Sequence, residues 1–392
     1  MRGRVKQLGA DKAFHPRLEA LRGLAALGVA AFHSWYAPWL DPDGRAHQFL
    51  AADASDGALA RLARFAGRVI ANGDGAVVIF FVLSGFVLAG SLERGPSQLA
   101  PAARRFVIAR LFRIYPAIAA TVTMFAIAFW LTGKQLMGAE NFSPAKLMSN
   151  ILLLEVSIDP VMWSLQVEVL AIPLVFAAYF LFRRWGTPAL AALSALLIGL
   201  SFSGGWQNAI PGVHQFGTVF AFMLGVMAYV LAPPLLKPCS PRTAQIALLI
   251  AAVAFFATRP LIGFASNWSV ILEAAFGAAI VAMLAFATSN KQNALLDSSV
   301  ARFYGRISYS FYLVHPLTLL VLWSEPALLG RPIAAGVPEG LVAVLLFVGS
   351  TLIITPLAWA MQRWIERPGI AAGRSVAKAA MFTPAPDRVI AK

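Results

Sequence analysis

The residues best suited to chemistry lie inside apolar stretches, where charged or titratable side chains are costly. Arg22 and His33 are eleven residues apart, a spacing that on a helix is close to three full turns and places both on one face, about 16 Å apart. Glu168 begins another apolar stretch five residues after Trp163. We expect it at about the depth of His33, where a carboxylate would orient the imidazole or raise its basicity.

Each of these residues also has a structural interpretation. A single histidine near a helix end often lies at the membrane interface or in a satisfied core position. Glu168 is harder to explain in this way, because a carboxylate gains nothing from an anionic interface and cannot reach far towards water. His315 precedes Pro316, and a backbone carbonyl freed by the proline would satisfy its ring.

A second group is basic. Arg104, Arg105, Arg110 and Arg113 fall within ten residues, with aromatic residues between them. Arg110 and Arg113 face the same way on a helix, and guanidinium groups match phosphate oxygens well. The alternative is contact with lipid headgroups on the cytoplasmic side. Upstream, the small residues of FFVLSGF at 80–86 allow a neighbouring helix or a ligand to approach closely.

Composition identifies the setting of these residues. Of 392 residues, 59% are hydrophobic and 13% charged, about half the charge of a soluble domain, which excludes a soluble single-core enzyme. One cysteine and five scattered histidines offer no metal-ligand spacing, so we expect no metal. The net charge of +14 is read as cytoplasmic loops of a membrane protein, and we expect no nucleic acid partner.

Dividing the chain at its charged and Pro/Gly-rich breaks predicts an all-α protein with ten membrane spans. With the N-terminus inside, 24 of the 32 Lys and Arg residues lie in cytoplasmic segments, the bias expected when both termini are cytoplasmic. The predicted spans are 22–40, 70–92, 114–132, 162–182, 188–204, 212–235, 243–258, 268–289, 307–324 and 338–362.

These spans define three regions: a cytoplasmic tail at 1–17, a membrane domain at 18–368 and a cytoplasmic tail at 369–392. The first span has only ten uninterrupted uncharged residues, Gly23 to Phe32, which by length also fits a cleaved signal peptide. The aromatic residues that follow favour a retained helix. In the loops we expect a short surface helix bearing Arg61, Arg64 and Arg68, and another within 140–160.

The order and intervals of six motifs resemble the acyltransferase-3 family of membrane acyltransferases. The match covers nearly the whole chain, and six motifs in order are specific although each is weak alone. Val78 departs from it, because many members carry a polar residue there, and the esterase-like C-terminal domain of some members is not expected. The motifs are Arg22-x10-His33, FFVLSGF at 80–86, RLFRIYP at 110–116, WSLQVE at 163–168, GRISYSFYLVHP at 305–316 and WIERP at 364–368.

The resemblance implies a multi-pass protein of the bacterial inner membrane. Such an enzyme transfers an acyl group, often acetyl, from cytoplasmic acyl-CoA to a hydroxyl of a cell-envelope or exported saccharide or glycolipid. It also implies that His33 is the catalytic histidine, that Arg22 is its paired basic residue, and that Arg110 and Arg113 engage the donor. Histidine suits the base that such a transfer needs near neutral pH. Because no GxSxG elbow is present, direct attack by the acceptor is preferred to an acyl-enzyme.

The full set of expected site residues follows from these points. The catalytic group is His33, Arg22 and Glu168; the acyl-CoA group is Arg105, Arg110, Arg113, Tyr115 and Ser84; Trp163, Tyr309 and His315 are further pocket residues. Membrane lipids are the other expected partner. The acceptor, the acyl length and the oligomeric state stay open. A proton-coupled transporter of a small solute is the alternative, since membrane-embedded Arg, His and Glu also serve proton-coupled transport.

Overall fold

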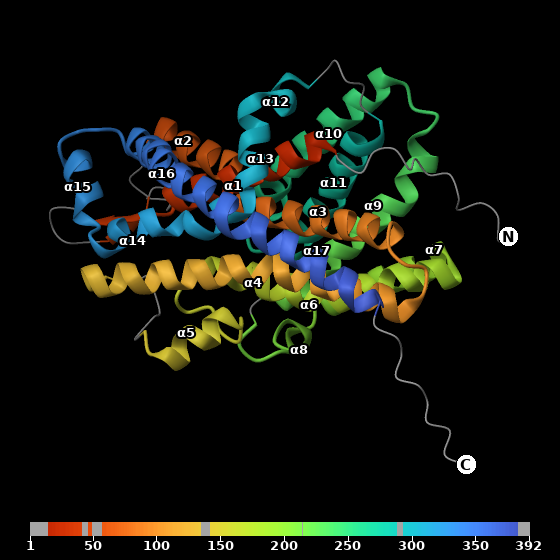
Figure 1. Cartoon of the computed structure of the whole chain (residues 1–392). Coiled ribbons are helices and arrows are strands. Elements are labelled where there is room, and N and C mark those ends of the chain that lie inside the picture. Colours follow the sequence, from red (N-terminus) through yellow and green to blue (C-terminus); the bar gives the residue numbers. More distant parts are fainter. Residues whose placement is uncertain are drawn as a thin grey trace, which may run out of the picture.

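A computed structural model describes residues 15–40, 46–48, 57–134, 142–213, 215–287 and 293–382. These ranges form a helical bundle (Figure 1), which confirms the all-α class. The strands within them are two short antiparallel ones, β1 (Pro38–Leu40) and β2 (Ala46–Gln48). Most of the predicted N-terminal tail, much of the 41–69 loop and residues 383–392 lie outside the described residues.

Each of the ten predicted spans contains a helix. Within the described ranges, seven helical stretches are long and apolar enough to cross a membrane, those containing α3, α4, α6, α9, α10, α11 and α16. The chain is therefore a multi-pass membrane protein, and ten crossings stay a prediction. The helices are α1 (Pro16–Trp35), α3 (Gly73–Glu93), α4 (Leu99–Thr132), α6 (Trp163–Trp185), α7 (Thr187–Leu200), α9 (Phe220–Leu236), α10 (Pro241–Ile262), α11 (Asn267–Phe286), α13 (Ser299–Val314), α14 (Pro316–Ser324) and α16 (Glu339–Met361).

The remaining elements are short connections and one C-terminal helix. The two predicted loop helices are present as α2 and α5, and α2 carries the three arginines. These elements are α2 (Ala58–Ile70), α5 (Pro144–Ile151), α8 (Gly204–Gln207), α12 (Ala294–Asp297), α15 (Ala327–Ala334) and α17 (Arg367–Phe382), with the 3-10 turns η1 (Pro160–Met162) and η2 (Phe216–Val219) and the π-helical turn η3 (Gln362–Glu366).

Two segments differ from their expected form. The predicted span 307–324 is divided into α13 and α14 at His315, because the residue before a proline disfavours helical continuation. The expected C-terminal tail begins as α17, which packs along α4. Gly369 allows this contact, since a Cβ there would lie 2.7 Å from the carbonyl oxygen of Phe112.

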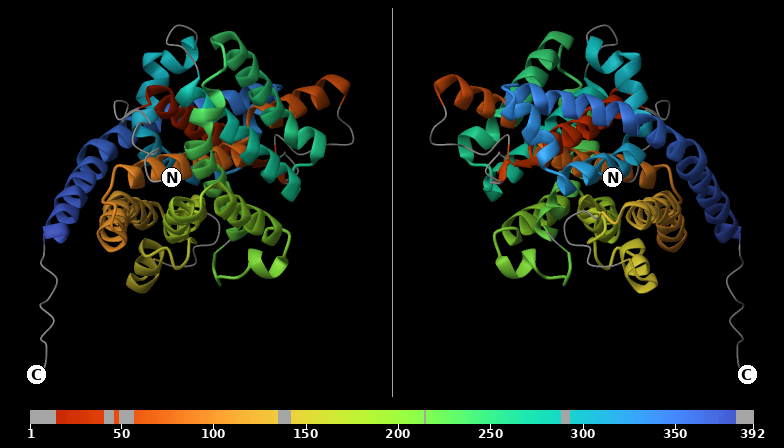
Figure 2. Two further views of the ribbon diagram at one scale, coloured as in Figure 1. Left: turned by 90° about the vertical axis from the view of Figure 1, so that its right-hand side faces the viewer. Right: turned by 90° about the vertical axis from the view of Figure 1, so that its left-hand side faces the viewer.

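The helices form two layers. Figures 1 and 2 show α4 to α8 on one side of the molecule and α1, α10, α13 and α16 on the other. Helix α3 is the most buried of the seven long apolar helices and packs against α1, α9 and α11. The expected close approach at Ser84–Gly85 is to a helix, because a Cβ on Gly85 would overlap the carbonyl oxygen of Phe222 in α9.

The position of α1 is fixed at two points. Gly23 lies directly against the backbone of α13 at Gly305, with no room for a Cβ on either residue. At the start of α1, Arg17 donates from Nε and Nη2 to the carboxylate of Asp297, at 3.1 and 2.8 Å. Those hydrogen bonds lower the pKa of Asp297. As a result α1, with Arg22 and His33, and α13, with Tyr309 and the His315 that follows its last residue, are held in one register.

Candidate functional site

A cavity of about 70 Å³ lies where the two layers meet. It brings together six of the residues predicted from the sequence, contributed by five helices: Arg22 from α1, Ser84 from α3, Arg110 and Arg113 from α4, Glu168 from α6 and Tyr309 from α13. Arg110 and Arg113 are three residues apart in the sequence, whereas Arg22 and Tyr309 lie near opposite ends of the chain. It is therefore the packing of the five helices that brings this group together.

The cavity carries a net positive charge. Three guanidinium groups face one carboxylate, that of Glu168, which accepts a long hydrogen bond from Ser84 Oγ at 3.5 Å. The Nε atom of Arg110 is buried and has no hydrogen-bond partner among the residues that the structure describes. A buried donor of this kind costs free energy unless a ligand or water accepts its hydrogen bond. The arrangement is therefore suited to an anionic ligand.

His33 has a different partner from the one expected. Its Nδ1 atom lies 2.8 Å from Nε2 of His315, and the two rings stack with their centroids 5.1 Å apart. The Nδ1 atom of His315 lies 2.7 Å from the backbone carbonyl oxygen of Tyr312. Glu168 instead belongs to the arginine cavity. The expected pairing of His33 with Glu168 is thus replaced by a pair of histidines.

The hydrogen-bond chain fixes the tautomers of two neutral rings. A carbonyl oxygen can only accept, so Nδ1 of His315 carries a proton and its Nε2 does not. Nε2 of His315 must then accept from Nδ1–H of His33. Nε2 of His33 is consequently the unprotonated nitrogen, which is the state a general base requires.

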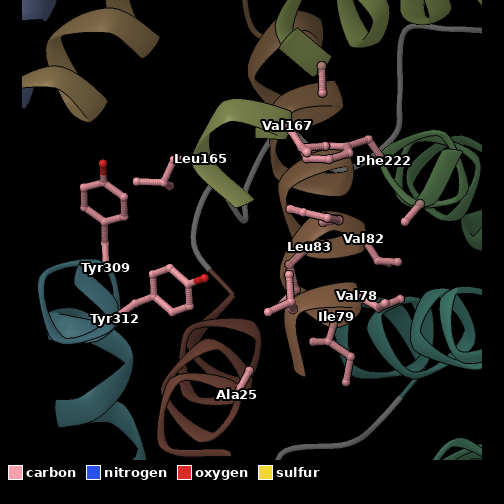
Figure 3. Close-up of a cluster of buried hydrophobic side chains, with 14 of the residues drawn as sticks. Ala25, Val78, Ile79, Val82, Leu83, Leu165, Val167, Phe222, Tyr309 and Tyr312 are labelled. Carbon is pink, nitrogen blue, oxygen red and sulfur yellow. The ribbon is translucent and has the colours of Figure 1, made fainter. Parts of the chain in front are cut away.

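Tyr312 connects the histidine pair to the cavity. Its side chain lines the cavity, its hydroxyl is 2.8 Å from Ser164 Oγ, and its ring centroid is 5.9 Å from that of His315. Figure 3 shows Tyr309 and Tyr312 extending from α13 towards the side where Leu165 and Leu83 lie. Neither histidine is part of the cavity lining: His315 contacts the lining residue Tyr312, and His33 is connected to it through His315. Sequence analysis missed Tyr312, although its three-residue spacing from Tyr309 and His315 signals a shared helix face.

Three other predicted residues lie apart from the arginine cavity. Arg105 donates from Nη1 to the carbonyl oxygen of Arg94, at 3.1 Å. Tyr115 is partly buried and packs against the hydrophobic core. Trp163 lines a second cavity and meets Phe81 edge to face, with the ring centroids 6.0 Å apart.

Sequence analysis also missed a second buried cluster of charged residues. Arg259, which the sequence placed in an outer loop, donates from Nε and Nη2 to the two carboxylate oxygens of Glu273, at 2.9 and 3.0 Å. Nη1 donates to Asp74 at 3.1 Å, and Asn72 donates to Glu273 at 2.7 Å. Glu273 is fully buried and is the single charged residue of α11, a signal that sequence reading had available. In the described ranges no group of three His, Cys, Asp or Glu side chains is placed to hold a metal.

A comparison of the chain with known protein families agrees with the arrangement of the cavity and the histidine pair. The family model Acyl_transf_3, described as an acyltransferase domain, matches residues 15–361. The match includes every cavity residue named above and both histidines. The chain therefore belongs to the acyltransferase-3 family and is a membrane acyltransferase. No curated protein and no solved structure matched the chain.

The Arg259–Glu273 pair leads to a stability prediction. Glu273→Gln should destabilise the protein by about 3 kcal/mol, because the buried guanidinium of Arg259 loses its buried counter-charge and keeps only the half-exposed Asp74. The measurement is the thermal unfolding midpoint in detergent or nanodiscs. The control is Arg259→Met combined with Glu273→Met, which removes both charges and should lose less than Glu273→Gln alone. A double variant less stable than the single one would contradict the assignment.

Proposed function

We propose that this protein transfers an acyl group, acetyl by preference, from cytoplasmic acyl-CoA to a hydroxyl group of a cell-envelope or exported saccharide or glycolipid. The bacterial inner membrane is its proposed location. Family membership supports acyl transfer. The observation that carries the rest is the convergence of Arg22, Arg110 and Arg113 on one cavity beside the His33–His315 pair.

The arginine cavity supports a phosphate-bearing donor. Arg110 and Arg113 lie in the N-terminal half of α4. The charge bias assigns the N-terminal end of this helix to the cytoplasmic side. The phosphates of coenzyme A would remain near these guanidinium groups, and the uncharged thioester would extend past Arg22. A cavity of about 70 Å³ has room for several water molecules, a space that suits a short acyl group.

His33 is the proposed general base. Its Nε2 would take the proton of the acceptor hydroxyl while the hydroxyl oxygen attacks the thioester carbonyl carbon. The new C–O bond forms, the C–S bond breaks, and the departing coenzyme A sulfur receives the proton from His33. Arg22 lies three helical turns, about 16 Å, along α1 from His33, so its proposed role is to hold the donor in the cavity. Because Tyr312 lines the cavity and contacts His315, the partner of His33, the acceptor hydroxyl would have to take the place of part of the Tyr312 side chain to reach His33.

His33→Ala should lower acetyl transfer by about 100- to 10,000-fold, the contribution of a positioned general base. The assay uses purified full-length protein in nanodiscs with radiolabelled acetyl-CoA, with mass analysis of envelope glycans from cells with and without the protein. Unchanged elution and unfolding midpoint serve as the folding control. Retained transfer by the variant would refute His33 as the base. Proton-coupled solute uptake without any acetyl transfer would favour the transporter.

His315 is proposed as a positioning residue that acts through His33. His315→Gln retains an acceptor for Nδ1–H of His33, whereas His315→Leu does not. We expect His315→Leu to lower kcat, leave KM for acetyl-CoA unchanged and displace the pH–rate profile, and His315→Gln to recover much of the loss. Equal losses in both variants, or an effect on KM alone, would show that His315 serves packing.

Arg110 and Arg105 form a matched pair for testing the donor site. Arg110→Gln should raise KM for acetyl-CoA by about tenfold, the scale of one charge-assisted contact to phosphate. Arg105→Gln removes the same charge from the same helix, but Arg105 bonds to a backbone carbonyl outside the cavity, so its KM should change little. Equal effects of the two substitutions would mean that general surface charge, and not the cavity, attracts the donor.

A further inference from the structure

A second and larger cavity, of about 500 Å³, lies at the end of the bundle where α3 and α6 begin and α10 ends. We call it the outer cavity. The carboxylate-bearing side chain of Asp74 is 53% exposed, so this cavity opens at its rim. Its volume lies within the range of small-molecule sites. It is lined by Asp74, Val77, Val78, Phe81, Trp163, Ser201, Phe202, Gly204, Gln215, Thr218, Arg259, Phe264, Ala265, Asn267 and Val270.

The lining combines aromatic rings with polar side chains and has no net charge. Trp163, Phe202 and Phe264 supply apolar ring surface, while Gln215 and Asn267 supply amide groups. The charged residues of the lining are Asp74 and Arg259, which pair with each other at 3.1 Å. The arginine cavity, by contrast, has three guanidinium groups and one carboxylate.

Arg259 is not available to an anion. Its Nε and Nη2 donate to Glu273, and its Nη1 donates to Asp74 and to the carbonyl oxygen of Phe264. Its side chain is 7% exposed. A phosphate or carboxylate entering the outer cavity would therefore meet no uncompensated positive charge and would lie near Asp74. The chemistry instead suits a neutral ring with apolar C–H faces and hydroxyl edges, which is a sugar residue.

The two cavities share one wall. Val77 and Phe81 line both of them and lie four residues apart, on one face of α3. The Phe81 ring stacks on Phe222 with centroids 4.8 Å apart and meets Trp163 edge to face. The end of α1 is also close, since Gly73 lies directly against the ring of Phe32, the neighbour of His33. Val77 and Phe81 are therefore part of the wall between the outer cavity and the arginine cavity.

We propose that the outer cavity binds the acceptor as a neutral saccharide, with a sugar ring against Trp163 and its hydroxyls bonded to the amides of Gln215 and Asn267. The Phe81 side chain is then the partition that a reacting hydroxyl must pass. Calling this ligand the acceptor rests on the proposed function. The binding of a neutral sugar in the outer cavity does not depend on the proposed function.

Two adjacent glycines allow a matched test. Gly204 lines the outer cavity, Gly205 follows it outside the lining, and a Cβ on Gly204 would meet no atom within 4 Å. Gly204→Trp should therefore fill the cavity without disturbing the fold, and Gly205→Trp adds the same side chain beside it. The nearest atom to a Cβ on Gly205 is the flexible Ser203 Oγ at 3.7 Å.

Saturation-transfer NMR on full-length protein in nanodiscs, without acyl-CoA, provides the measurement. The probes are chitobiose as a neutral saccharide and glucose 6-phosphate and glucuronate as anionic ones. We expect binding of chitobiose in preference to both anions, at least a tenfold weakening by Gly204→Trp, as expected when a central contact is lost, and no change by Gly205→Trp. Trp163→Leu, which removes the ring platform, makes the same test if Gly204→Trp does not fold.

Three results would overturn the inference: no chitobiose binding, anionic sugars bound equally well, or chitobiose binding unaffected by Gly204→Trp. Because this binding experiment contains no acyl-CoA, its result does not decide the outcome of the acetyl-transfer assay. Chitobiose binding that depends on Gly204 and Trp163 would hold even if no acetyl were transferred. Acetyl transfer with a sugar bound elsewhere would leave the proposed function intact and remove the outer cavity from it.

Discussion

The high cost of a charge in an apolar interior is the constraint on which this structure depends. The chain meets it in two ways. Around Arg259 the charges are neutralised by neighbouring carboxylates and saturated with hydrogen bonds. Around Arg22, Arg110 and Arg113 the charges are not fully neutralised, because the lining of that cavity has three guanidinium groups and a single carboxylate. The first arrangement is expected of a structural pair, and the second of a site that receives an anion.

Close backbone contacts make the second arrangement possible. Gly23 and Gly305 bring α1 and α13 together at a point near Arg22. From that contact, α13 extends Tyr309 and Tyr312 to the cavity and His315 to His33. A larger side chain at either glycine would separate the helices and with them the basic cavity from the imidazole pair. The packing of α1 against α13 is therefore also what sets the geometry of the site.

The sequence predicted the helices and all the charged residues of the cavity lining, for physical reasons. Apolar length and charge breaks located a helix in each proposed span, and helical spacing correctly placed Arg110 and Arg113 together. Depth counted from aromatic residues at the ends of predicted spans was less informative. Glu168 was expected at the depth of His33, yet it lines a cavity with Arg22, three helical turns from His33 on α1, and His33 bonds to His315. The interpretation of His315 is confirmed, because Pro316 frees the carbonyl oxygen of Tyr312, four residues earlier, and Nδ1 of His315 bonds to it at 2.7 Å.

The separation of the two cavities bears on how the proposed reaction would avoid hydrolysis. A thioester held near Arg22 would be attacked by water as well as by a sugar hydroxyl if the passage were open. Val77 and Phe81 line both the arginine cavity and the outer cavity, and Tyr312 lines the arginine cavity and contacts His315 of the histidine pair. Side chains can rotate where backbone cannot, so a bound acceptor would displace them more readily than bulk water. On this proposal the aromatic wall excludes water until the second substrate is in place, and the base meets the thioester only when a hydroxyl has entered between them.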